Sequence, residues 1–200
     1  MKTASPPDAA SRAAVLTALK ERRTCRVFDG RPVPRAVVET MLDAARWAPN
    51  HRLTNPWRFF VVEKGGTVRS EVADLVYDWT FENVKNPTQE RRVQSAQAAK
   101  QEILDAPALL YVFAVPGRDA EETDENYAAA CCAIQNLQLA AYAHGVATGW
   151  STGKPLKPAG IAAAVGAKPD WRAVGALFCG YPAQQASQER RPVSEVTTWV

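Results

Sequence analysis

Residues 44–62 read A-A-R-W-A-P-N-H-R-L-T-N-P-W-R-F-F-V-V, and this stretch does most to decide how the chain folds. It begins in a segment that opens at Val33-Pro34 and repeats apolar residues at spacings of three and four, which predicts a helix that stops near Pro49. The run from Phe59 to Val62 is apolar and partly β-branched, and Gly65-Gly66 ends it, so we expect a first strand there. A helix and a strand are therefore joined by a loop rich in proline, tryptophan and hydrogen-bonding side chains.

Further elements are expected on both sides of this stretch. They are a helix over 8–22, one or two surface helices over 67–104 with an interruption near Asn86-Pro87, a strand over 108–115, a long helix over 123–144, and strands over 146–150 and 174–179. We find no internal repeat and no linker, so the prediction is a single domain over 1–200, a sandwich of a sheet and helices, with a polar tail.

The composition excludes several classes of protein. The chain has 200 residues, of which 46% are hydrophobic, and a formal net charge of only +3, so we expect no nucleic-acid surface. Neither a signal-peptide core nor an apolar run of about 18 residues is found, which predicts a cytoplasmic protein without a membrane span. The four cysteines show no C-x-x-C spacing and are expected to be reduced and mostly buried, with the Cys131-Cys132 pair in the core.

The long helix expected over 123–144 contains almost no charge over 128–134 and 137–143. A helix that is apolar on all sides must be enclosed on all sides. In so small a chain a second copy can supply part of the cover, and we therefore expect a homodimer.

Three segments carry residues suited to ligand binding. Residues 21–26, E-R-R-T-C-R, place three guanidinium groups and a hydroxyl where a helix meets a turn, as in a phosphate clamp, although such a cluster also occurs on solvated surfaces. The loop over 47–57 combines rigid prolines with Asn, His and Arg, which suits the edge of a planar heteroaromatic ring but also an ordinary anchored loop. Residues 148–153, T-G-W-S-T-G, are small and hydroxylated, which fits close approach of a ligand or a structural turn.

Taken together and in this order, the three segments resemble the nitroreductase family of FMN-dependent oxidoreductases. R-R-T-C-R-V-F is similar to the family's first-helix signature, and A-P-N-H resembles the A-P-x-H form of its small, minimal-domain bacterial members. The resemblance implies an α+β fold, an α-β-α sandwich with a central, mostly antiparallel sheet flanked by helices, in a domain-swapped homodimer. The C-terminal arm, residues 184–200, would then embrace the partner.

The resemblance also implies that FMN lies at the dimer interface and that no metal is bound. Arg22, Arg23 and Thr24 would hold FMN from one subunit, with Arg26 close by. Trp47 and His51 would approach it from the partner. Trp150, Ser151 and Thr152 would complete the pocket. Because minimal members often have Arg where this chain has Ser151, we expect Arg190 or Arg191 to supply the missing charge.

The activity implied is transfer of electrons from NAD(P)H, through flavin N5, to a nitroaromatic, a quinone or a similar small-molecule acceptor in a ping-pong cycle, without a catalytic acid or base. His51 is expected to donate a hydrogen bond to the flavin, with protonation of a substrate as the alternative. Residues 67–104 are expected to cover the flavin. Two other classes stay open, a protein that stores or consumes FMN without such turnover, and a dimeric interaction module without cofactor.

Overall fold

A computed structural model describes residues 6–85, 88–184 and 187–200. The interruption expected at Asn86-Pro87 lies outside the described residues. The helices are α1 (Ala9–Glu21), α2 (Arg35–Ala45), α3 (Thr67–Asn83), α4 (Gln89–Asp105), α5 (Ala120–Ala143) and α6 (Ile161–Val165). The strands are β1 (Trp57–Val62), β2 (Ala108–Ala114), β3 (Ala147–Ser151) and β4 (Arg172–Gly180), and short 3-10 helices lie at His51–Leu53, Lys154–Leu156 and Val193–Glu195.

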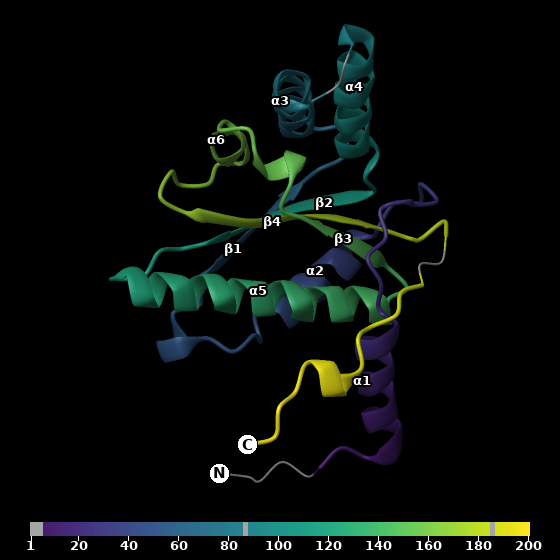
Figure 1. Ribbon diagram of the computed structural model, residues 1–200, viewed down its shortest axis with the longest axis vertical. Helices are drawn as coiled ribbons and strands as arrows, with labels where there is room; N and C mark the ends of the chain where they lie inside the picture. Colours follow the sequence, from purple (N-terminus) through teal and green to yellow (C-terminus); the bar gives the residue numbers. More distant parts are fainter. Residues whose placement is uncertain (1–5, 86–87, 185–186) are drawn as a thin grey trace.

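The four strands form one sheet in the order β1-β2-β4-β3, and every pairing is antiparallel. β2 lies in the middle and is buried along its whole length, so its side chains serve two cores. Leu110 and Val112 face the core with α2 and α5, whereas Leu109 and Tyr111 face the core with α3, α4 and α6. The predicted three-layer α-β-α arrangement is confirmed, and Figure 1 shows the helices above and below the sheet.

The helices α3 and α4 pack against each other on the side of the sheet opposite α2 and α5 (Figure 1). Arg69 fixes this pair to the sheet, because its buried guanidinium donates hydrogen bonds to the carbonyl oxygens of Val62, Ile103 and Ala106 at 2.6, 2.7 and 3.3 Å. Burial lowers the pKa of Arg69 to about 10, and the side chain stays charged at neutral pH.

Two parts of the chain have apolar side chains that the other described residues leave exposed. α1 has no buried residue. It projects away from the sheet and the other helices, and the C-terminal tail runs on the same side of the molecule (Figure 1). On α5, Ala128, Cys132 and Ala143 are exposed and Leu139 is half-buried, and together they form the α5 stripe. The prediction that Cys132 lies in the core is wrong for the single chain, although Cys25 and Cys179 are buried and all four cysteines are free.

Within the described residues, none of the helices combines the length and the apolar character needed to cross a bilayer. Residues 154–167 hold elements that periodicity did not predict, the 3-10 helix at Lys154–Leu156 and the five-residue α6. An element of five residues is shorter than the window in which helical spacing can be recognised.

Candidate functional site

The arginines that follow α1 lie at a cavity of about 470 Å³, here called the arginine cavity. Asp8 caps the start of α1, and its carboxylate accepts a hydrogen bond from the Ser11 amide at 2.7 Å. The helix ends at Glu21, so the next two residues, Arg22 and Arg23, enter the cavity wall. The described residues that line it are Glu21, Arg22, Arg23, Cys25, Tyr142, Gly145, Val146, Ala147, Pro182, Gln184 and Ser187.

The arginine cavity carries buried positive charge without a matching acceptor. Nε and Nη1 of Arg22 and Nε of Arg23 are buried, and no described residue accepts a hydrogen bond from them. The pKa of Arg22 is lowered by burial first, then by the charges of Arg190 and Arg23. The Glu21 carboxylate at the rim accepts a hydrogen bond from the Tyr142 hydroxyl at 3.1 Å. Buried guanidinium donors require acceptors, and the oxygens of a phosphate fit them in charge and geometry.

Arg26 does not join this cavity, although the sequence led us to expect it close by. Its guanidinium lies 4.2 Å from the centre of the Phe178 ring, and its Nε is 2.8 Å from Oε1 of Glu102 on α4. The stem crosses Gly149, where an added Cβ would lie 2.2 Å from Cγ of Arg26. Arg26 therefore lines a separate cavity of about 460 Å³. The side chain of Arg26 could have pointed toward Arg22 and Arg23 or away from them, and the sequence spacing of residues 22–26 does not reveal which direction it takes.

The neighbouring Thr24 is exposed, and its backbone pairs with Thr148 of β3 in an isolated parallel bridge. Trp150 lies on the same strand, but its indole Nε1 donates to the carbonyl oxygen of Val174 at 3.2 Å. Ser151 accepts a long hydrogen bond from the Gly153 amide at 3.4 Å, and Thr152 is exposed. Among the described residues, the linings of the arginine cavity and of the His51 groove defined below include none of these four side chains.

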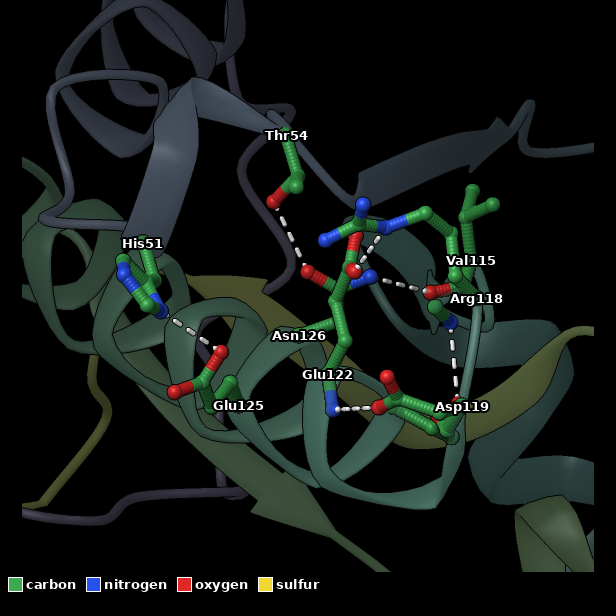
Figure 2. Close-up of polar contacts among 10 residues, drawn as sticks. His51, Thr54, Val115, Arg118, Asp119, Glu122, Glu125 and Asn126 are labelled. Carbon is green, nitrogen blue, oxygen red and sulfur yellow. Dashed lines mark hydrogen bonds and ion pairs between the residues drawn. The ribbon is translucent and has the colours of Figure 1, made fainter.

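The loop after α2 forms a second concave surface against the start of α5. This His51 groove has a volume of about 340 Å³ and is lined by Pro49, Asn50, His51, Glu125, Ala128, Ala129 and Cys132. Nδ1 of His51 lies 2.8 Å from Oε2 of Glu125, and the Thr54 hydroxyl donates to Oδ1 of Asn126 at 2.7 Å (Figure 2). Trp47, just before the loop, is 73% exposed. An apolar ring this open to water is suited to contact with another molecule.

The loop holds an unusual backbone. Arg52, Leu53 and Asn55 have φ angles of 54°, 54° and 45°, in the left-handed region. For residues other than glycine such angles cost on the order of 1–3 kcal/mol each, and they occur mostly where the surrounding structure holds the chain for a function. Periodicity and composition located this loop, but they did not indicate that three of its residues have left-handed backbone conformations.

The arginine cavity and the His51 groove lie near opposite ends of α5. Tyr142 lines the cavity and Glu125 lines the groove, and these 17 helical positions span about 25 Å at about 1.5 Å per residue. One chain therefore does not gather the predicted site residues around one point. No described residue of α3 or α4 lines either hollow of the single chain, and the expectation that residues 67–104 cover the flavin stays a prediction.

Comparison with known proteins agrees with this architecture. The family model described as the nitroreductase family matches residues 19–181. This range includes the end of α1, with the arginines that line the arginine cavity, and the His51 loop. This chain belongs to the nitroreductase family. A provisionally named NAD(P)H nitroreductase of Bacillus subtilis (strain 168), YfhC, is 31% identical over 173 residues, covering 86% of this chain and 87% of the relative.

Three other similar proteins extend the comparison. A 5,6-dimethylbenzimidazole synthase of Rhodospirillum rubrum is 28% identical and covers 88% of this chain and 82% of its own. A nitroreductase-like protein from Bacillus cereus superposes with a TM-score of 0.79 at 26% identity, over 100% of this chain and 98% of that one. A Desulfovibrio desulfuricans structure, in complex with FMN, gives 0.71 at 25% identity, over 99% and 98%.

Sequence reasoning missed several residues that the structure places at these surfaces. Tyr142 and Gln184 line the arginine cavity, and Glu125 and Asn126 hold the loop. Glu125 and Asn126 sit in the first turns of a long helix, where acidic and polar residues are common because they favour the helix N-terminus. Their partners lie more than 70 positions earlier, and no local pattern reveals such contacts.

Proposed function

We propose that the chain is an FMN-dependent oxidoreductase that uses NAD(P)H and reduces a small organic acceptor such as a nitroaromatic or a quinone. The observation that carries the proposal is the pair of buried Arg22 nitrogens that find no acceptor among the described residues, beside a second arginine, in a cavity open to a ligand. In the family to which the chain belongs, a relative of known structure is described in complex with FMN. The donor set fits the terminal phosphate of that cofactor.

In this proposal Arg22, Arg23 and Arg190 hold the phosphate. The charge of Arg190 already acts on Arg22, which favours Arg190 over Arg191 as the residue that compensates for Ser151. Thr24 is adjacent and exposed, and Ser151 and Thr152 remain candidates for contacts to the rest of the ligand. Trp150 would act through the strand that it fixes, because its indole N–H is already bonded to Val174.

We further propose that the active unit is a homodimer with the ligand between subunits. The single chain leaves the cavity and the groove about 25 Å apart along α5, and it leaves the α5 stripe, α1 and the tail uncovered. A second copy related by a two-fold axis would place the Trp47 and His51 loop of one subunit near the arginines of the other. The tail, with Val193 and Trp199 at 73% and 93% exposure, would cover the partner.

Bound FMN would supply the redox chemistry, accepting hydride from NAD(P)H and passing electrons to the acceptor in a second half-reaction. In this proposal the protein holds the phosphate of FMN and presents hydrogen-bonding groups to the flavin ring. The α5 stripe, covered by the partner subunit, would exclude water from the interface. No protein acid or base is required for hydride transfer itself. The ping-pong order follows if one ring face serves both substrates in turn.

Steady-state assays test the activity. FMN-loaded protein should oxidise NADH or NADPH several times faster with a nitroaromatic or a quinone present than without one. Flavin-free protein should show neither rate. A loaded protein that leaves both nucleotides intact with every acceptor would overturn the proposal.

The dimer has its own test. Ala128→Glu places a charge on the exposed α5 stripe and should give a monomer that retains no FMN, measured by light scattering and by flavin absorbance. Ala98→Glu, on an exposed position of α4, is the matched control and should leave a flavin-bearing dimer. A wild-type monomer that binds FMN fully would contradict this arrangement.

A second function deserves a test because the Rhodospirillum rubrum relative is named as a synthase of a benzimidazole. In that case the flavin itself would be consumed. Mass spectrometry of the flavin after repeated turnover with NADPH in air separates the two. Intact FMN supports the oxidoreductase, and its loss supports the alternative.

A further inference from the structure

We infer that Glu125 is a positioning residue that fixes the proton of His51 on Nδ1, so that the neutral ring presents Nε2 as a hydrogen-bond acceptor to an N–H group of the ligand. The ligand part of this inference rests on the proposed function, in which the ring edge of FMN carries such an N–H. The part concerning the proton of His51 holds for the protein alone.

The hydrogen bond between His51 and Glu125 determines the tautomer. An ionised carboxylate has only acceptor oxygens, so the 2.8 Å contact between Oε2 of Glu125 and Nδ1 of His51 requires the proton on Nδ1. A neutral imidazole has one proton, and Nε2 is then left as an acceptor. Among the residues that the structure describes, Nε2 has no protein partner. The sequence led us to expect a donor at His51, and this geometry reserves that role for the doubly protonated ring.

The position of Glu125 is itself fixed by its neighbours on α5. Asn126 is 4% exposed, and its amide Nδ2 donates to the Val115 carbonyl oxygen at 3.1 Å while its Oδ1 accepts from Thr54. The start of the helix is capped by Asp119, whose carboxylate accepts from the Glu122 amide at 2.8 Å (Figure 2). The loop is thus tied to one rigid helix turn at two consecutive residues, 125 and 126.

The two ties bracket two of the three residues of the loop that have left-handed backbone. Arg52 and Leu53, both with left-handed backbone, lie between His51 and Thr54, which make the two contacts. Strained loop conformations persist where the surroundings over-determine them, and that is the geometry seen at ligand clamps. His51 is 56% exposed at its side chain and lines the groove with Glu125, so a ligand can reach the ring.

The tautomer can be read by nitrogen NMR of the two histidine side chains, His51 and His144. Flavin-free protein is measured about two pH units above the ordinary histidine pKa of about 6.5, and His144→Gln assigns the signals. We expect a protonated Nδ1 and an unprotonated Nε2 in His51, a change toward the Nε2–H form in Glu125→Ala, and partial retention in Glu125→Gln, whose amide oxygen can still accept. A His51 ring protonated on Nε2 in the wild type, or unchanged in Glu125→Ala, would overturn the inference.

The matched control is Glu121→Ala, which removes the same charge from the same helix one turn earlier, at an exposed residue. It should leave the His51 signals unchanged. If it moves them as much as Glu125→Ala does, the effect comes from the general field of the helix and the positioning role is refuted.

The ligand part is tested by titrating flavin-free protein with FMN and riboflavin. Glu125→Ala should weaken both by the same factor, roughly 3- to 10-fold, as for loss of one aligned hydrogen bond, whereas Glu121→Ala should weaken neither. Equal affinities in Glu125→Ala and the wild type would overturn the ligand part. A protein that binds no flavin would instead refute the proposed function, with the tautomer result standing or falling on the NMR alone.

Discussion

Replacing Arg22 by Gln tests the phosphate clamp directly, because the change removes the charge and the two buried nitrogens, Nε and Nη1, that have no acceptor in the described protein. Truncating one partner of a desolvated, hydrogen-bonded charge pair costs about 2–5 kcal/mol in binding free energy. At about 1.4 kcal/mol per factor of ten, the Kd for FMN should rise roughly 30-fold or more, up to a few thousand-fold.

The same substitution should not lower the free energy of unfolding of the flavin-free protein. Burial and the charges of Arg190 and Arg23 all lower the pKa of Arg22, which means that its charged form is disfavoured in the folded state. Arginine stays charged in the unfolded chain at any ordinary pH. A neutral Gln should therefore leave the urea midpoint of the flavin-free protein unchanged or slightly higher.

The assay is quenching of flavin fluorescence on titration with FMN and, separately, with riboflavin, which lacks the phosphate. Arg22→Gln should weaken the binding of FMN strongly and the binding of riboflavin little. Arg12→Gln, an exposed position of the same helix, carries the same charge change and should affect neither ligand. If Arg22→Gln weakens FMN and riboflavin equally, or neither, Arg22 does not bind the phosphate and the reasoning fails.

Three further predictions concern the fold. Gly149→Ala should destabilise the protein by about 1–3 kcal/mol, because the added Cβ would lie 2.2 Å from Cγ of Arg26. Gly153→Ala is the control, because its Cβ would meet nothing nearer than Ser151 Oγ at 3.8 Å. Equal melting temperatures of the two variants would contradict the crossing of Arg26 over β3. Arg69→Met should cost at least about 3 kcal/mol in urea unfolding, because three buried carbonyl groups each lose a donor at roughly 1–3 kcal/mol, while Arg35→Met, 87% exposed at its side chain, should change stability little. Burial raises the pKa of Cys179 from 9.0 to about 12, so the thiol loses its proton at lower pH in the unfolded chain than in the folded one. The free energy of unfolding should therefore fall by about 1.4 kcal/mol between about pH 8 and about pH 10 because of this thiol. If the free energy of unfolding falls as steeply with pH in Cys179→Ala as in the wild type, the prediction is refuted.

The sequence was most informative where the physical cause is local. The cap at Asp8, the arginines that follow the first helix and the apolar runs of β1 and β2 are all set by neighbours in the chain, and their elements appear within a few residues of the predicted limits. The nearly uncharged part of α5, over 128–143, also indicated a surface that the described residues of the single chain do not cover, and the exposed stripe at Ala128 and Cys132 agrees with that expectation.

What the sequence did not reveal depends on direction and on distant partners. Arg26 turns toward Phe178 and Glu102 because Gly149 leaves room for its stem, and that choice is made by residues more than 70 positions away. The tie between His51 and Glu125 is equally remote. The side of the sheet on which α3 and α4 pack follows from chain topology, and their own periodicity does not reveal it.

Anaerobic stopped-flow mixing of the FMN-loaded protein with NADPH or NADH alone tests the central claim most directly. We predict that the visible absorbance of the flavin bleaches with one of the nucleotides in the absence of any acceptor, and returns when a nitroaromatic or quinone is added in a second mix. A flavin that stays oxidised with both nucleotides would contradict the oxidoreductase assignment, and bleaching that requires the acceptor to be present would contradict the two-step order.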